Sequence, residues 1–398
     1  MLSHRLTHSW KIVKANRSTD KLVHGTILSL VAIGFATLAT PGAACPFCSA
    51  VSQTIRQEME VMDAVAVASC LDTDLSRDTR TGEVRMKIDR VLKGKQLIRA
   101  GEEVTVIYYG EIKSGRKFML SGVDPPKLEW SALPLSKRAE AYVVKVGDLP
   151  KEDDVERLRF FMPYLEDEEL MLSRDAYDEF AITPYVAIQK LAPEMDHAQL
   201  VEWLSDAEMS ADRRRLYLTM LGVCGSKADL PMLESMLTST EKSSRSGLDA
   251  LIACYLTLAG ESGLPMINKL FITNKSAPYA ETYAAIMAIR FHGTDGDVIA
   301  RSALLPSLHH ILERQDLADL VIPDLARWND WSQIDRLTRL FIEADENNTW
   351  VRVPVVNYLQ ACPLPAAKEA IEKVKKVDPE SVSRANIFFP KPQAEPAS

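Results

Sequence analysis

The chain lacks the short motifs that mark the common classes of enzyme. Its 398 residues contain no nucleophile elbow G-x-S-x-G, no zinc motif H-E-x-x-H, no phosphate loop G-x-x-x-x-G-K-[ST] and no dinucleotide-binding G-x-G-x-x-G. Serine, histidine and acidic residues are present, but no spacing brings them together as a catalytic set. We therefore predict no catalytic residue, no cofactor and no metal site, and the sequence favours a protein that is not an enzyme.

Basic clusters are scarce beyond position 25. The segment 1–44 holds five Lys and Arg residues and one acid, and the whole chain carries −8, so the remainder carries −12. The densest basic run in the remainder, Arg213 to Arg215, fits a solvated helix face. Nonspecific nucleic-acid binding depends on neutralising phosphates with Lys and Arg. A nucleic-acid partner is therefore not expected.

A long uninterrupted apolar run is also missing, since a membrane-spanning helix needs roughly 18–20 such residues. The run Thr26–Thr40 is shorter than this; it follows a basic segment and precedes small residues. This is the layout of a secretory signal. We predict a signal peptide over 1–44, cleaved after Ala44, and an exported protein that is periplasmic or extracellular. An uncleaved N-terminal anchor and a lipid on Cys45 are the alternatives, and only these would link the chain to a membrane.

Cysteine is rare, with six in the chain, and two of the six form the motif Cys45-Pro46-Phe47-Cys48. Disulfides persist in the compartments that exported proteins reach, so we expect a structural staple. A redox-active pair, a metal site and an attached group are the alternatives. Haem attachment would need histidine where Ser49 stands, and zinc would need two further ligands. Cys70 could pair with Cys45 or Cys48, so these three residues are the disulfide or redox candidates.

Residues 45–147 have the pattern of a small β domain. A helix-like run over 51–60 follows the two cysteines, and then short segments rich in β-branched and aromatic residues alternate with Gly and Pro turn signals. Such spacing indicates an antiparallel barrel or sandwich. Trp130 follows Pro125-Pro126 in what we predict to be an exposed loop, and it is a candidate for contact with a partner. The predicted strands cover residues 61–71, 84–92, 104–109, 116–123 and 141–146.

The composition changes from residue 148 onward. Acidic residues surround one apolar stretch in 148–180, which indicates a charged helical connector. Over 181–377, apolar residues recur at spacings of three and four in one segment after another, which predicts helices. The final residues, 378–398, become rich in proline, and we predict a disordered tail.

The helical segments repeat with a period of roughly 34 residues, which is a usual length for helical-repeat units. Leu230 and Leu264 begin two similar segments one period apart, and Val298 falls one period further on. A period of this length with two helices per unit indicates stacked hairpins, because one hairpin cannot bury its apolar face alone. The predicted fold is therefore α+β and multidomain: a small antiparallel β barrel or sandwich followed by an α-solenoid over 181–377.

The repeated segments resemble HEAT repeats, with armadillo-like and TPR-like repeats as the near alternatives. The likeness rests on Leu-Pro-Met-(Leu/Ile) at 230–233 and 264–267 and on glycine-containing breaks at 222–225 and 260–263. The resemblance to HEAT repeats implies an extended surface that binds another protein.

The β domain resembles the tissue-inhibitor/netrin-like OB barrels. The likeness rests on the Cys45 and Cys48 pair ahead of the strands and on the turn Val91-Leu92-Lys93-Gly94. The resemblance implies that the cysteine pair is stapled to the barrel. From the predicted signal and the repeat period we expect an exported, non-catalytic scaffold whose helical-repeat surface binds another protein. The alternative is a periplasmic thiol–disulfide protein that acts through Cys45 and Cys48.

Overall fold

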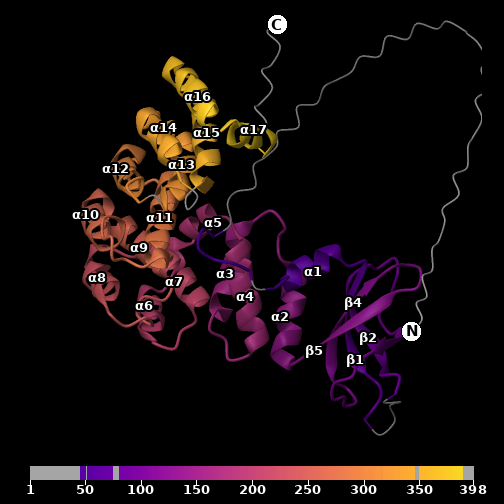
Figure 1. The fold of residues 1–398 in the computed structure, drawn as a ribbon. Coiled ribbons are helices and arrows are strands. Elements are labelled where there is room, and N and C mark those ends of the chain that lie inside the picture. The colour runs from indigo at the N-terminus through magenta and orange to yellow at the C-terminus, as the bar shows by residue number, and fades with distance from the viewer. Residues whose placement is uncertain (1–44, 51, 75–79, 315, 346–348, 389–398) are drawn as a thin grey trace, which may run out of the picture. The chain divides into compact units, whose positions relative to one another are not determined.

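The computed structural model describes residues 45–50, 52–74, 80–314, 316–345 and 349–388 (Figure 1). All of these residues belong to one unit, which spans 42–398. The predicted signal peptide, 1–44, and the end of the predicted tail, 389–398, lie outside the described residues.

Five antiparallel strands form one sheet: β1 (Ala64–Cys70), β2 (Glu83–Lys93), β3 (Glu103–Ile107), β4 (Lys117–Val123) and β5 (Glu129–Leu135). Their order in the sheet is β3-β2-β1-β4-β5, and the edge strands β3 and β5 approach each other. The sheet is therefore curled into a half-barrel. Apolar side chains that alternate along the strands, such as Val84, Met86 and Phe118, fill its interior. The first four predicted strands are confirmed.

The fifth predicted strand, over 141–146, is wrong. These residues lie in helix α2 (Lys137–Asp148), which begins after Ser136, whose hydroxyl accepts a hydrogen bond from the amide of Ala139. The buried side chains of α2 are spaced three or four apart, as a helix requires, and valine-rich composition alone had suggested a strand. Strand β5 takes the missing place at the sheet edge.

The other helices run along the remainder of the described chain, apart from α1 at its start (Figure 1). They are α1 (Ile55–Val61), α3 (Asp154–Phe161), α4 (Leu170–Ile182), α5 (Tyr185–Lys190), α6 (His197–Ser205), α7 (Ala211–Cys224), α8 (Leu230–Thr238), α9 (Leu248–Ala259), α10 (Leu264–Ile267), α11 (Tyr279–Thr294), α12 (Arg301–Ile311), α13 (Ala318–Arg327), α14 (Ile334–Glu343), α15 (Arg352–Ala361), α16 (Pro365–Val377) and α17 (Pro379–Phe388).

Helices pack against their chain neighbours and also against helices one step further along the chain. The pairs α6 with α7 and α8 with α9 are chain neighbours, whereas α7 packs on α9 and α9 packs on α11. The same pattern returns near the C-terminus, where α13 packs on α15, α15 on α17 and α14 on α16. In each of these two groups, helices two apart in the chain therefore lie side by side.

Helix α17 corrects the predicted tail. Residues 379–388 are helical, and Asp378 holds the start of the helix by accepting hydrogen bonds from the amide and hydroxyl of Ser381. Arg352 of α15 binds the same carboxylate at 2.7 Å. The prolines that suggested disorder begin only at Pro390, beyond the described residues.

Candidate functional site

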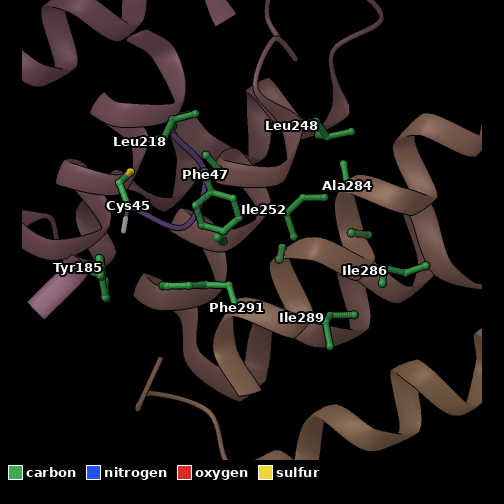
Figure 2. Packing of buried hydrophobic residues seen from close by; sticks show 14 of the residues in the cluster. Cys45, Phe47, Tyr185, Leu218, Leu248, Ile252, Ala284, Ile286, Ile289 and Phe291 are labelled. Carbon is green, nitrogen blue, oxygen red and sulfur yellow. The ribbon is translucent and has the colours of Figure 1, made fainter. Parts of the chain in front are cut away.

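The cysteine motif at the start of the described chain packs against helices. Cys45 is 3% exposed and Phe47 is also buried, and both belong to the apolar cluster that contains the cores of α5, α7, α9 and α11. The ring of Phe47 meets the ring of Phe291 edge-on, with centroids 5.1 Å apart (Figure 2). The start of the predicted 45–147 domain thus contributes to the helical core.

The side chain of Phe47 lies among four helices. Together with Phe47 itself, Tyr185 of α5, Leu218 of α7, Ala253 of α9 and Phe291 of α11 surround one small hollow. Burying a phenylalanine side chain contributes about 1.5–3 kcal/mol, and edge-on ring contacts add about 0.5–1.5 kcal/mol. We call the surroundings of this hollow the Phe47 seat, and its contacts hold the turn that carries Phe47 against the helices.

Helix α4 anchors the residues that follow the seat. The hydroxyl of Tyr177 donates to the carbonyl of Ser49 at 3.3 Å. The amide and hydroxyl of Ser52 both donate to the carboxylate of Asp178, at 3.2 and 2.8 Å. Asp178 is fully buried. These bonds connect segments 126 or more residues apart in the chain, so they fix the docked segment by tertiary contact.

A second buried carboxylate of α4, Asp175, caps helix α1. It accepts the amide of Ile55 and the hydroxyl of Tyr142, each at 2.7 Å. Burial raises the pKa of Asp175 to about 6, although both hydrogen bonds favour the charged form. The neighbouring carboxylates of Glu179 and Asp178 raise it further. This carboxyl group therefore titrates well above the usual range for aspartate.

The third carboxylate of α4, Glu179, pairs with Arg56 of α1. The Nε of Arg56 donates to both oxygens of Glu179 at 3.1 Å, and a second guanidinium nitrogen reaches Glu60 at 3.1 Å. Glu179 has no exposed surface, and a buried charge is tolerated only when it is paired. The pair therefore ties α1 to α4.

This anchoring was missed from the sequence. Asp175, Asp178 and Glu179 are spaced three and four apart, so they share one face of a helix, and that spacing was a usable signal. Acidic residues are usually solvated, and the sequence does not show that a segment far earlier in the chain covers this face.

Cys45 and Cys48 form a disulfide, and the amide of Cys48 donates to the carbonyl of Cys45 at 3.2 Å. The bond closes a tight turn that carries Phe47. Cys70 does not pair with either of them: it is a free, buried thiol on β1 whose sulfur donates to the carbonyl of Asp72. Burial raises the pKa of the Cys70 thiol. Two of the three candidate cysteines are therefore brought together.

Trp130 is not in an exposed loop. It lies on β5 and is half-buried, and its indole ring covers Gly122 of β4, where an added Cβ would come within 2.8 Å of the ring. The ring packs on the apolar clusters of the sheet. The side chain helps to build the sheet, and contact of Trp130 with a partner stays a prediction.

A cleft of about 390 Å³ adjoins the Phe47 seat. The two hollows share Tyr185, Gly222, Thr257 and Phe291. The remaining wall of the cleft mixes small, apolar and polar residues: Gln189, Ala192, Val223, Gly225, Leu258, His292, Gly296, Asp297 and Val298. Together, the seat and the cleft form one concave feature on these helices.

In the described part of the chain, no group of three or more His, Cys, Asp or Glu residues could hold a metal ion. One helical stretch, Leu248–Ile272, is long and apolar enough to cross a membrane by length and composition. It begins with α9, and most of it is buried in the fold, as in a core helix.

The chain has no match among family models, curated proteins or solved structures, so the seat and the cleft are interpreted from their own geometry.

Proposed function

We propose that this protein is an exported, non-catalytic scaffold that binds a short segment of another protein on the face formed by α5, α7, α9 and α11. One observation carries the proposal: that face already holds a short, disulfide-closed turn of the same chain, with Phe47 inserted among four helices. A surface that accommodates one short segment has apolar contacts that can accommodate another.

A HEAT-like solenoid is the arrangement that we propose for these helices. Arg215 of α7 binds Asp249 of α9 at 2.9 Å, and Arg290 of α11 binds Asp324 of α13 at 2.9 Å. Each pair spans 34 residues, which equals the period found in the sequence. Equal offsets are expected when successive units repeat one packing geometry.

The curled sheet supports the proposed OB-like domain. A five-stranded, partly open antiparallel barrel is the arrangement of OB folds, and the described sheet has five antiparallel strands with its two edges close together. In this proposal the sheet is a second module beside the helical scaffold.

Thiol–disulfide exchange through Cys45 and Cys48 is the less favoured function. Exchange needs a thiolate to reach a sulfur atom of the disulfide. Cys45 is 3% exposed, whereas Cys48 is only half-buried, so attack could reach one sulfur more readily than the other. The surroundings of the pair fit a staple that shapes the docked turn.

Peptide binding in trans tests the scaffold proposal. The probe is a fluorescent peptide of residues 45–56 with its cysteines oxidised, and the recipients are the full wild-type chain and a Phe47→Ser variant. Because the chain's own segment fills the seat, we expect the probe to bind the variant at least tenfold more tightly, measured by fluorescence anisotropy. Replacing phenylalanine by alanine in the probe should weaken binding at least tenfold, since it removes the buried ring.

The matched control is Val186→Ser, which changes an exposed apolar residue of α5 outside the seat. This variant should bind the probe no better than the wild-type chain does. If the Phe47→Ser variant fails to bind, or binds both probes equally, the face is not a peptide-binding surface and the proposal is wrong.

A further inference from the structure

The cleft beside the Phe47 seat differs from the seat in its charge. Its lining contains no Lys or Arg among the described residues, and Asp297 supplies its only carboxylate. Asp295 lies two residues earlier in the same turn and is half-buried. Within the described chain, neither aspartate takes part in an ion pair or a side-chain hydrogen bond.

The charges of Asp297 and Asp295 both act on Tyr185 in the wall of the cleft. Burial, followed by the charge of Asp297 and more weakly that of Asp295, raises the pKa of Tyr185 to about 12. Burial also raises the pKa of Asp295. Since Tyr185 lines both the seat and the cleft, the negative potential extends to the boundary between them.

His292 does not offset this negative charge. It is 1% exposed, and burial lowers its pKa to about 4, so the ring is neutral at ordinary pH. Its Nε2 lies 3.1 Å from the carbonyl of Ala253, which requires Nε2 to carry the hydrogen and leaves Nδ1 as an acceptor. No described group donates to Nδ1. The hydroxyl of Thr257 also donates to the Ala253 carbonyl, so its remaining capacity is as an acceptor.

We propose that this cleft receives a cationic side chain, Lys or Arg, from the partner segment whose apolar residue occupies the Phe47 seat. The inference rests on the scaffold proposal and adds to it the chemistry of the partner. Two observations carry it: the cleft is continuous with a seat that already holds part of the chain, and neither Asp297, which lines the cleft, nor Asp295 beside it has a cationic partner within the described residues. Asp297 is exposed at the cleft and Asp295 is half-buried, so a cation placed there would gain charge-assisted hydrogen bonds.

The test uses the full chain with Phe47→Ser and three series of fluorescent peptides built on residues 45–56. Lysine, glutamine or glutamate is placed in turn at positions 46, 49, 50 and 51, so that the oxidised cysteine pair of the probe is kept. At one position or more, the lysine peptide should bind about fivefold to tenfold more tightly than its glutamine twin, and the glutamate peptide more weakly than both. An arginine twin at that position shows whether the preference is for charge in general.

Adding Asp297→Asn should remove most of the lysine advantage and leave binding of the glutamine peptides unchanged. Glu369→Gln on α16 removes one exposed carboxylate elsewhere and should keep the advantage, which controls for the net charge of the chain. Because the pairing is partly exposed, the advantage should also shrink as salt is raised.

Three outcomes are decisive. If the glutamine peptides bind but lysine gives no advantage at any position, the cationic subsite is wrong while the scaffold proposal stands. The same holds if the lysine advantage survives Asp297→Asn combined with Asp295→Asn. If no peptide binds, both proposals fail.

Discussion

At the scale of single residues, Asp175 gives the clearest link between burial and stability. Its pKa is about 6 in the folded chain and near 3.8 when unfolded, so between these values the folded state holds more protons than the unfolded state. The free energy of unfolding therefore falls as pH rises through this window and levels off above it. A pKa difference of this size corresponds to a change of about 3 kcal/mol in the free energy of unfolding.

The variant Asp175→Asn tests this. It removes the titrating group and keeps an acceptor for Ile55 or Tyr142, so the unfolding free energy should no longer fall between about pH 4 and pH 6. Urea unfolding at closely spaced pH values measures the slope. Asp378→Asn is the control. Burial raises the pKa of Asp378, but hydrogen bonds from Ser381 and Arg352 outweigh it and lower the pKa to about 2. The stability that this carboxylate contributes is therefore lost only at lower pH. A slope unchanged by Asp175→Asn would contradict this assignment.

At the scale of elements, the sequence pattern predicted the strands whose formation follows local residue preferences. The strands over 84–92 and 104–109 alternate or are β-branched, and the structure has strands there. The strand predicted over 141–146 was wrong. Two adjacent valines suit a strand locally, whereas the cap at Ser136 and the burial of Tyr142 favour a helix. Long-range contacts override such preferences.

The docked N-terminal segment could not be predicted from the sequence. The cysteine motif was recognised, but its partner surface comes from Tyr185, Leu218 and Phe291, which lie far along the chain on three separate helices. No periodicity in the sequence connects a short disulfide-closed turn to a set of helix faces. The sequence therefore predicted the disulfide of the candidate site. It did not predict the Phe47 seat, because the seat depends on tertiary packing.

The disulfide should strengthen docking of this segment by restricting its undocked state. Closing so short a loop is expected to contribute about 2 kcal/mol, so replacing both Cys45 and Cys48 by serine should raise the undocked population about 30-fold. Amide hydrogen exchange of residues 47–50, followed by mass spectrometry, measures this population. Exchange in α1 should change less, because its anchors to Asp175 and Glu179 remain.

Replacing the free, half-buried Cys224 by serine is the control for thiol removal, and it should leave exchange over 47–50 unchanged. Unaltered exchange in the double serine variant would show that Phe47 and the α4 anchors hold the segment without help from the disulfide.

At the scale of the whole molecule, the question is whether the helices form a linear stack or one cooperative bundle. The Arg290–Asp324 pair separates the two cases, because Asp324 is fully buried and binds the guanidinium of Arg290 with both oxygens. Arg290→Gln leaves this carboxylate with Arg327 as its remaining ionic partner, and breaking a buried pair costs about 3–5 kcal/mol. In a stack, each unit contacts only its neighbours, so the damage should stay local.

Hydrogen exchange should therefore rise in α11, α13 and α15 of the Arg290→Gln variant and stay near wild-type values in α6 and α7. Arg215→Gln, which breaks the more exposed pair with Asp249, should raise exchange less and should do so in α7 and α9. The two variants would then raise exchange at two separate places along one stack of helices, as the common offset of 34 residues implies. If either substitution instead raises exchange equally from α4 to α17, the helices unfold as a single bundle. The equal offsets would then have a cause other than repetition, and the extended binding surface would lose its structural basis.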